Sequence, residues 1–319
     1  MDASRARFTL PLLIATIAFL TTAAGARIVA VANDYSVADA LTHVEAWIKA
    51  HPKEPAGYRT LARIHALAFA YGEKIPLVGT SARDALPTFT EDSTVLVSRT
   101  APREALWTTK AVPPGNRPDR PLTADDAKHL SASVVAYQKA LELDPTDGLS
   151  ELGLGWMLAQ QGLYAREIPA DFFGDHKPTA AEKAAWAESI RQLADDKQNV
   201  RDAAGKTLLA AMPQCALALR NADAKDPPTK ARLDAILQTW FDLQSLEHYR
   251  KAYILQADVD VMGAPDYQAD SQISAKAGAQ ILAILARHPE AETKDESKTI
   301  RETLEPLAKK RQSLMTQPQ

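Results

Sequence analysis

The stretch from residue 133 to residue 164 constrains the fold more than any other part of the chain. Its first half predicts a helix with one apolar face, formed at helical spacing by Val134, Tyr137, Leu141 and Leu143. Asp144-Pro145 ends that helix, because proline disfavours helical geometry in the residue before it. A second apolar helix follows and runs to about Gly162. Two such helices joined by a short turn fold back on each other, since neither can bury its apolar face alone.

Small and aromatic residues in this stretch resemble the tetratricopeptide repeat, a pair of antiparallel helices. The matching residues are Ser133, Tyr137, Ala140 and Pro145, followed by Leu154, Gly155, Leu158, Gly162 and Tyr164. A weaker copy consists of Ala40, Val44, Trp47 and Pro52, followed by Tyr58, Leu61, Ala62 and His65. Two partial copies are Ser245, Tyr249 and Ala252, and then Ala277, Ile281, Ile284 and Pro289. The resemblance covers about half of the chain and implies stacked helical hairpins.

The copies do not follow one another in a single register. The prolines at 52, 145 and 289 are not separated by multiples of the ~34-residue repeat. After Tyr164, the second helix that the repeat requires runs into Pro169. We therefore expect an all-α fold of stacked antiparallel helical hairpins, an irregular tetratricopeptide-like (TPR-like) α-α superhelix that carries a long loop insertion.

Proline and glycine divide the chain into segments. Residues 33–72 are expected to form the first TPR-like hairpin, with helices at 39–50 and 56–71. Residues 73–122 are a Pro-rich insertion in which Thr94–Val97 favours a short strand. A loop of this length is unusual in a compact domain, so it either carries function or covers apolar helix surface. Residues 123–315 are expected to form further TPR-like hairpins and long helices.

Within this last part, capping patterns mark two helix starts, Thr123 with Asp126 and Thr179 with Glu182. The second predicts one long helix that ends before Pro213, with an inward face of Trp186, Ile190, Leu193, Val200, Ala204 and Leu208. The loop at 171–174 is expected to expose Phe172 and Phe173. Further helices are predicted at 229–256, 273–287 and 299–315, the last interrupted by Pro306.

The N-terminus has the layout of a secretory signal. Arg5 and Arg7 precede an apolar run from Phe8 to Leu20, and Ala24-Gly25-Ala26 provides a small-residue cleavage site. We expect residues 1–26 to be a signal peptide and the mature chain to be exported, to the periplasm or outside the cell. The alternative is an uncleaved membrane anchor, because residues 8–26 nearly match the thickness of a bilayer.

Composition and motif searches give no support for specific chemistry. The formal net charge of −3 and the lack of a basic stripe argue against nucleic acid as a partner. Gly205-Lys206-Thr207 resembles the end of a phosphate-binding loop, but Val200 stands where the motif needs glycine. The seven histidines are scattered, and Cys215 lies in an apolar run that indicates a buried, inert thiol. We predict no catalytic residues, no metal site and no cofactor.

Two functions from different classes remain. The first is an exported scaffold that mediates protein-protein or peptide interaction. In the resembling family, first helices of repeats line the concave surface, which implies binding roles for Arg59 and Arg63 and for Leu152, Trp156 and Gln160. The two arginines share a helix face and could hold a carboxylate together, while Trp156 could anchor a partner. The second is an enzyme or small-ligand-binding protein, with its site between the 73–121 insertion and the helices.

Overall fold

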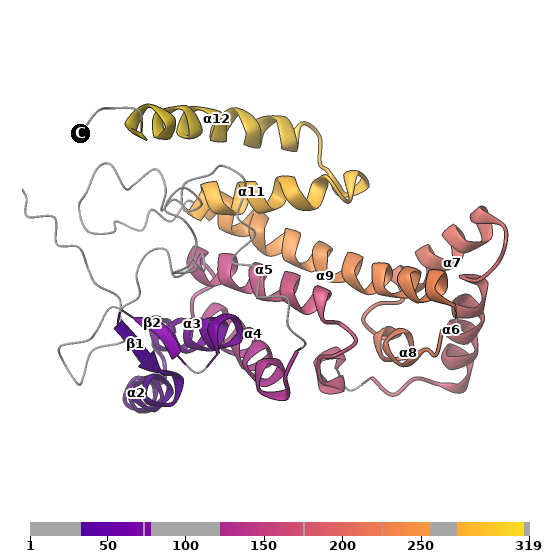
Figure 1. The fold of residues 1–319 in the computed structure, drawn as a ribbon, viewed down its shortest axis with the longest axis horizontal. Helices are drawn as coiled ribbons and strands as arrows, with labels where there is room; N and C mark the ends of the chain where they lie inside the picture. Colours follow the sequence, from indigo (N-terminus) through magenta and orange to yellow (C-terminus); the bar gives the residue numbers. More distant parts are fainter. Residues whose placement is uncertain are drawn as a thin grey trace, which may run out of the picture. The chain divides into compact units, whose positions relative to one another are not determined.

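The computed structural model describes residues 33–72, 74–77, 122–174, 176–224, 226–255 and 273–315. This part of the chain is predominantly helical, which confirms the predicted helical class (Figure 1). The predicted signal peptide, most of the 73–122 insertion and the strand expected at 94–97 lie outside the described residues.

Helices α2 (Val37–Ala50) and α3 (Pro55–Tyr71) form the first antiparallel hairpin, as predicted. Ser36 caps α2, because its side chain accepts a hydrogen bond from the backbone N–H of Asp39 at 3.1 Å. The two helices approach closely at Gly57 of α3, where a Cβ atom would lie 2.6 Å from the Trp47 ring. Glycine at this position therefore lets the α2 aromatic ring lie against the α3 backbone.

A two-stranded antiparallel sheet closes this hairpin, which the sequence did not predict. Strand β1 (Asn33–Ser36) enters α2 and strand β2 (Lys74–Leu77) leaves α3, with Asn33 opposite Leu77. Because the two helices are antiparallel, the segments before and after them meet, and their backbone groups can pair. Pro76 is tolerated in β2 because both strands of a two-stranded sheet are edges.

The second pair of helices matches the prediction for the 133–164 stretch. Helix α4 (Ala124–Leu143) begins at the Thr123 capping box, in which Thr123 accepts from the Asp126 N–H and donates its own N–H to the Asp126 carboxylate. Helix α5 (Gly148–Leu163) begins at Asp147, whose carboxylate accepts from the first-turn N–H groups of Leu149 and Ser150. Helix α4 contacts both α3 and α5.

Helix α9 (Pro227–Leu255) covers α5 on its other side, although 63 residues separate the two helices in sequence. The intervening segment holds η2 (Ala170–Phe173), α6 (Ala180–Gln192), α7 (Gln198–Ala210) and α8 (Ala216–Asn221). Helices α7 and α8 contact α9, and α6 contacts both of them. The position that a regular hairpin partner of α5 would take is therefore filled by a helix much later in the chain.

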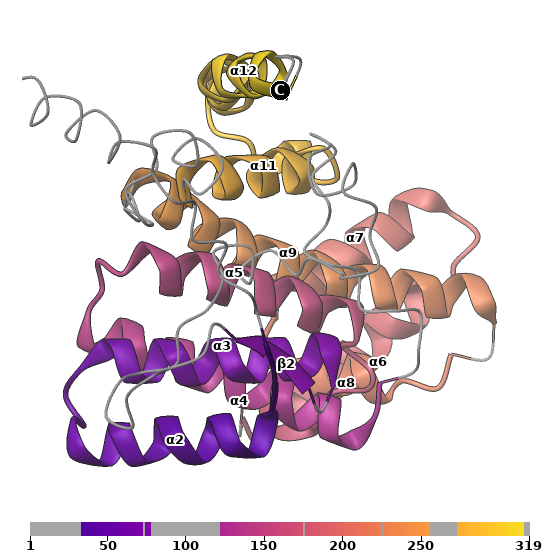
Figure 2. The same cartoon turned by 60° about the vertical axis from the view of Figure 1, so that its left-hand side comes forward.

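The last helices continue this series of neighbouring contacts. Helix α11 (Ile273–Leu285) contacts α9 and also α5, and after η3 (Pro289–Ala291) the chain enters α12 (Glu296–Met315), which contacts α11 (Figure 2). Arg250 of α9 fixes the start of α12, because its guanidinium donates to both carboxylate oxygens of Glu296 at 2.7 and 2.6 Å.

Three detailed predictions for this region are wrong. The helix expected to run from Ala180 toward Pro213 is divided by a turn after Leu193, where the Asp195 side chain accepts from the backbone N–H of Lys197. Helix α12 runs from Glu296 to Met315 without a break at Pro306. Phe173 is buried rather than exposed, with its ring centroid 6.1 Å from that of Phe241.

The core around α5 explains why the small-aromatic-small pattern recurs. In α4 and α9 the residues of that pattern are almost wholly buried, namely Ser133, Tyr137, Ala140, Ser245, Tyr249 and Ala252. Gly153 of α5 faces the Tyr137 ring and Gly155 faces the Tyr249 ring. Residues two apart on a helix point in nearly opposite directions, so the two glycines receive one tyrosine from each side.

Candidate functional site

The five predicted site residues lie on helices α3 and α5, which contact each other. Arg59, in the first part of α3, contacts Asp147 at the start of α5. Phe69, near the end of α3, contacts Trp156 in the second half of α5 and Tyr164 just after that helix. These contacts follow the same order in both helices, so α3 and α5 run in the same direction. We call the surface that carries these residues the α3–α5 face.

One end of this face is cationic. Arg59 Nη1 donates to the Asp147 carboxylate at 2.6 Å, and the Arg59 side chain keeps 30% of its surface exposed. Burial lowers the pKa of Arg63 to about 10, and the neighbouring charges that act on it are those of Arg59 and Asp147 and the Tyr137 hydroxyl. Burial in turn raises the pKa of Tyr137 to about 12, so this phenol stays neutral. Two charged guanidinium groups thus lie near the Asp147 carboxylate.

The sequence predicted that the two arginines could hold a carboxylate together. For Arg59 that carboxylate belongs to the chain itself, since Asp147 both caps α5 and accepts from Arg59. Arg59 is thus paired within the chain, and burial is the main influence on the pKa of Arg63.

The other end of the face is aromatic. Phe69 lies edge-on to Trp156 at a centroid distance of 6.3 Å and edge-on to Tyr164 at 6.0 Å. Trp156 and Leu152 belong to the hydrophobic core, with 9% and 8% of their surface exposed, while Gln160 is half-buried. Within the described part of the chain, the buried indole N–H of Trp156 has no hydrogen-bond acceptor. Buried donors are nearly always paired, so this unpaired N–H is an exception among the described residues.

Sequence reasoning missed three members of this face. Asp147 carried a signal, because an aspartate followed by glycine after a proline turn is a typical helix N-cap. Phe69 and Tyr164 carried none, because their edge-on contacts depend on how α3 and α5 lie side by side.

A second polar cluster lies inside the protein between α9 and α11. The carboxylate of Asp242 is fully buried and accepts from Gln238 at 2.8 Å, from Arg287 at 3.0 Å and from His288 at 3.0 Å. Burial and the Asp242 charge raise the pKa of the nearby Tyr249 hydroxyl. Gln238, Arg287 and His288 all donate to the same Asp242 carboxylate, which identifies the cluster as a link between α9 and the segment after α11.

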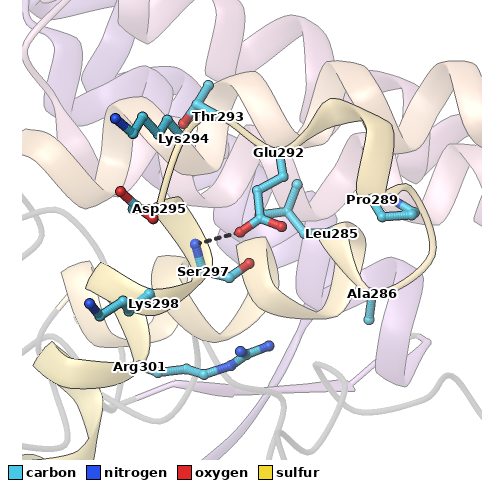
Figure 3. Close-up of a pocket in the computed structure, with 10 residues that line it drawn as sticks. All are labelled: Leu285, Ala286, Pro289, Glu292, Thr293, Lys294, Asp295, Ser297, Lys298 and Arg301. Carbon is cyan, nitrogen blue, oxygen red and sulfur yellow. Dashed lines mark hydrogen bonds between the residues drawn. The ribbon is translucent and has the colours of Figure 1, made fainter.

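A pocket of about 540 Å³ lies where α11, η3 and α12 meet (Figure 3). Its residues are Leu285, Ala286, Pro289, Glu292, Thr293, Lys294, Asp295, Ser297, Lys298 and Arg301. Glu292 accepts from the backbone N–H of Ser297 at 2.9 Å. None of these ten residues has a buried side-chain polar atom without a hydrogen-bond partner. The pocket therefore contains no buried polar atom that a ligand would be needed to satisfy.

Two sequence features with a possible chemical role lie in helix α7 and at the start of α8. Gly205-Lys206-Thr207 lies within helix α7, so this segment does not form a phosphate-binding loop. Cys215 is fully buried, as predicted, and burial raises the pKa of its thiol to about 11. In the ranges that the structure describes, no three histidine, cysteine or acidic side chains come together to hold a metal ion.

No family model matches this chain, and no curated protein or solved structure shows significant similarity to it. Among the helices that are described, none has both the length and the apolar character needed to cross a membrane. The function therefore has to be inferred from the chain's own side chains, and the α3–α5 face is the strongest candidate.

Proposed function

We propose that this chain is an exported helical scaffold of irregular TPR-like architecture, which binds a peptide or protein segment across the α3–α5 face. The observation that carries the proposal is the parallel contact of α3 and α5, which brings Arg59 beside Asp147 and Phe69 beside Trp156 from two separate hairpins. A regular repeat protein places first helices of successive hairpins side by side in the same way.

The helix contacts support the architectural part of the proposal. Helix α5 contacts both α3 and α11 in addition to the helices α4 and α9 that lie against it. Contacts between every second helix arise when hairpins stack in one direction. The insertion of α6 to α8 between α5 and α9 accounts for the irregular spacing of the repeat-like pattern.

The two ends of the face favour a partner with both polar backbone groups and a negative charge. The amide of the half-buried Gln160 can bond a backbone group of a bound segment. The buried indole N–H of Trp156, one helical turn earlier on α5, would donate to a backbone carbonyl of that segment once the contacts that bury it open. At the cationic end, an acidic side chain of the partner would share Arg59 and Arg63 with Asp147. Such a segment would lie along the direction that α3 and α5 share.

Site-specific photo-crosslinking tests this location. A photoreactive amino acid in place of Gln160 is expected to capture one defined partner in cells that export the protein. The matched control carries the same amino acid in place of Val135 of α4, which is 62% exposed. Equal capture from both positions, or capture from Val135 alone, would place the partner elsewhere and contradict the proposal.

A second measurement separates binding from packing. We expect Trp156→Phe to reduce crosslinking from position 160 at least fivefold, because it removes the N–H but keeps an aromatic ring against Phe69. Its melting temperature should stay within a few degrees of the parent protein. Unchanged capture with a large fall in melting temperature would show that Trp156 serves the core alone.

Export gives a separate prediction. The intact mass of the exported protein should correspond to a chain that begins at Arg27, because cleavage is expected after Ala26. Arginine at Ala24 and Ala26 should block this cleavage, since the site requires small residues. A mature protein that retains residues 1–26 would favour the membrane-anchored alternative.

A further inference from the structure

Two histidines face each other across the joint between α3 and α4. The Nδ1 atoms of His65 and His129 are 2.8 Å apart, and their ring centroids are 5.1 Å apart. Elsewhere in the described chain, His248 contacts Glu151 and His288 contacts Asp242, so in those pairs a base meets an acid. In the His65–His129 pair a base meets a base, so protonation of both rings breaks the contact instead of strengthening it.

The chemistry of the imidazole ring limits the charge that this pair can hold. A hydrogen bond between two Nδ1 atoms needs one protonated nitrogen and one with a free lone pair. The pair can be neutral, or it can carry one extra proton on a ring that donates to its neighbour. If both rings are imidazolium, both Nδ1 atoms carry hydrogen and both rings are positive, so a separation of 2.8 Å cannot persist.

We propose that the His65–His129 pair is a proton-sensitive latch between α3 and α4, closed while at least one ring is neutral and opened when both rings are protonated. The proposal goes beyond the binding function above and does not depend on the partner. It concerns the joint that holds the first hairpin to the rest of the described helices.

The surroundings of the pair favour the closed, neutral form. Burial lowers the pKa of His65 to about 4, with a further contribution from His129, and burial also lowers the pKa of His129. On α4, the carboxylates of Asp125 and Asp126 oppose this lowering of the His129 pKa, and the charge of Lys128 adds to it. The two carboxylates are engaged locally, Asp125 with Lys128 and Asp126 with the Thr123 cap.

The other charged side chains of α3 act on groups other than the two histidines. On α3 itself, Arg59 and Arg63 act on Asp147 and Tyr137. Among the side chains that the structure describes, no charged group of α2 or α5 contributes to the pKa shift of either ring. The response of the latch therefore depends on the two histidines and the first turns of α4.

The pair lies where its opening would affect both the α3–α4 contact and the α3–α5 face. Ser133 of α4 donates to the backbone carbonyl of Ala62 at 2.9 Å, about one turn from the histidine contact on both helices. His65 also lies between Arg59 and Phe69 along α3, the two ends of the proposed binding face. Separation of the rings would loosen this joint and displace both ends of the face relative to α5.

The direction of the pH effect follows from linkage. The ordinary pKa of histidine is 6.5 and that of folded His65 is about 4, so the unfolded chain binds more protons between these values. The stabilising contribution is complete above pH 6.5 and is lost as the pH falls toward 4. Between pH 7 and pH 4.5 this single group should reduce the folding equilibrium constant on the order of 100-fold.

Urea unfolding between pH 4.5 and pH 7 tests the latch, with His65→Phe as the main variant. Phenylalanine keeps a ring in the joint but cannot titrate, so the acid-induced fall in the folding constant should be at least tenfold smaller than in the parent protein. The matched control is His51→Gln, because His51 is exposed at the end of α2. The folding equilibrium constant of this variant should depend on pH as it does in the parent protein. The same acid-induced fall in His65→Phe as in the parent would overturn the proposal.

Ring resonances of the parent protein provide a test that does not rely on the variant folding. A nuclear magnetic resonance titration should show His65 remaining neutral well below pH 6. Protonation of both His65 and His129 above pH 6 with their contact intact would overturn the proposal. A rise in melting temperature with Zn²⁺ that His65→Phe abolishes would also overturn it, because the pair would then be a metal site.

Discussion

Asp242→Ala is expected to lower the free energy of unfolding by ~3 kcal/mol or more. The Asp242 side chain is fully buried and accepts from Gln238 of α9 and from Arg287 and His288 in the turn after α11. Without the carboxylate, the donors of Gln238 and His288 lose their acceptor inside the protein. Arg287 adds little to this cost, because its side chain is 52% exposed and can be solvated. Urea unfolding at neutral pH measures the change.

The matched control for this variant is Asp125→Ala. Asp125 also pairs with a cation, Lys128, but both side chains are more than 70% exposed. Its loss should change stability by less than ~1 kcal/mol. Asp242→Asn should fall between the two variants, since the amide oxygen can still accept from Gln238 but carries no charge for Arg287. Equal effects of Asp125→Ala and Asp242→Ala would show that burial of the Asp242 cluster has no energetic consequence.

Gly153→Ala is expected to lower the free energy of unfolding by ~3 kcal/mol. An added Cβ would lie 2.2 Å from Cζ of Tyr137 and 2.5 Å from its hydroxyl oxygen, well inside van der Waals contact. The tyrosine cannot move into solvent without leaving the core, because it is only 3% exposed. The helices α4 and α5 must therefore separate or the ring must adopt a strained rotamer. Thermal and urea unfolding both report the loss.

Gly205→Ala is the matched control for this glycine. Gly205 also lies inside a helix, α7, but the nearest atom to an added Cβ is 3.9 Å away. Alanine should raise stability there by ~0.5–1 kcal/mol, because glycine is the poorer helix former. In addition, Tyr137→Val should recover part of the loss in the Gly153→Ala protein, since it removes the ring that clashes. A destabilisation by Gly205→Ala of the same size would mean that the steric argument at Gly153 is wrong.

The comparison of predicted and observed helices shows where sequence patterns are sufficient. The boundaries of α2 to α5 and of α9 follow from apolar spacing, proline and capping residues, which act over a few neighbouring positions. The break after Leu193 was missed because Leu193 itself is buried on the expected face, so the apolar pattern passes across the turn. The β1–β2 pairing was missed because it depends on the return of the chain through α2 and α3.

The candidate site shows the same division. The residues Arg59, Arg63, Leu152, Trp156 and Gln160 could be named from helical spacing and the repeat resemblance. Their environment could not, because the pairing of Arg59 with Asp147 and the edge-on contact of Trp156 with Phe69 join residues 88 and 87 positions apart. Whether a side chain is solvated, paired or buried depends on which helix lies beside it.

The sequence by itself determined the helical class, the hairpin at 133–164, the capping boxes and the buried cysteine, since each depends on local propensity or apolar spacing. Only the tertiary structure decided that α9 rather than the next segment covers α5, that two histidines meet at the α3–α4 joint, and that Asp242 is enclosed. These features depend on burial and contacts between helices far apart in sequence. Local patterns state which face of a helix is apolar, but they do not state which other helix covers that face.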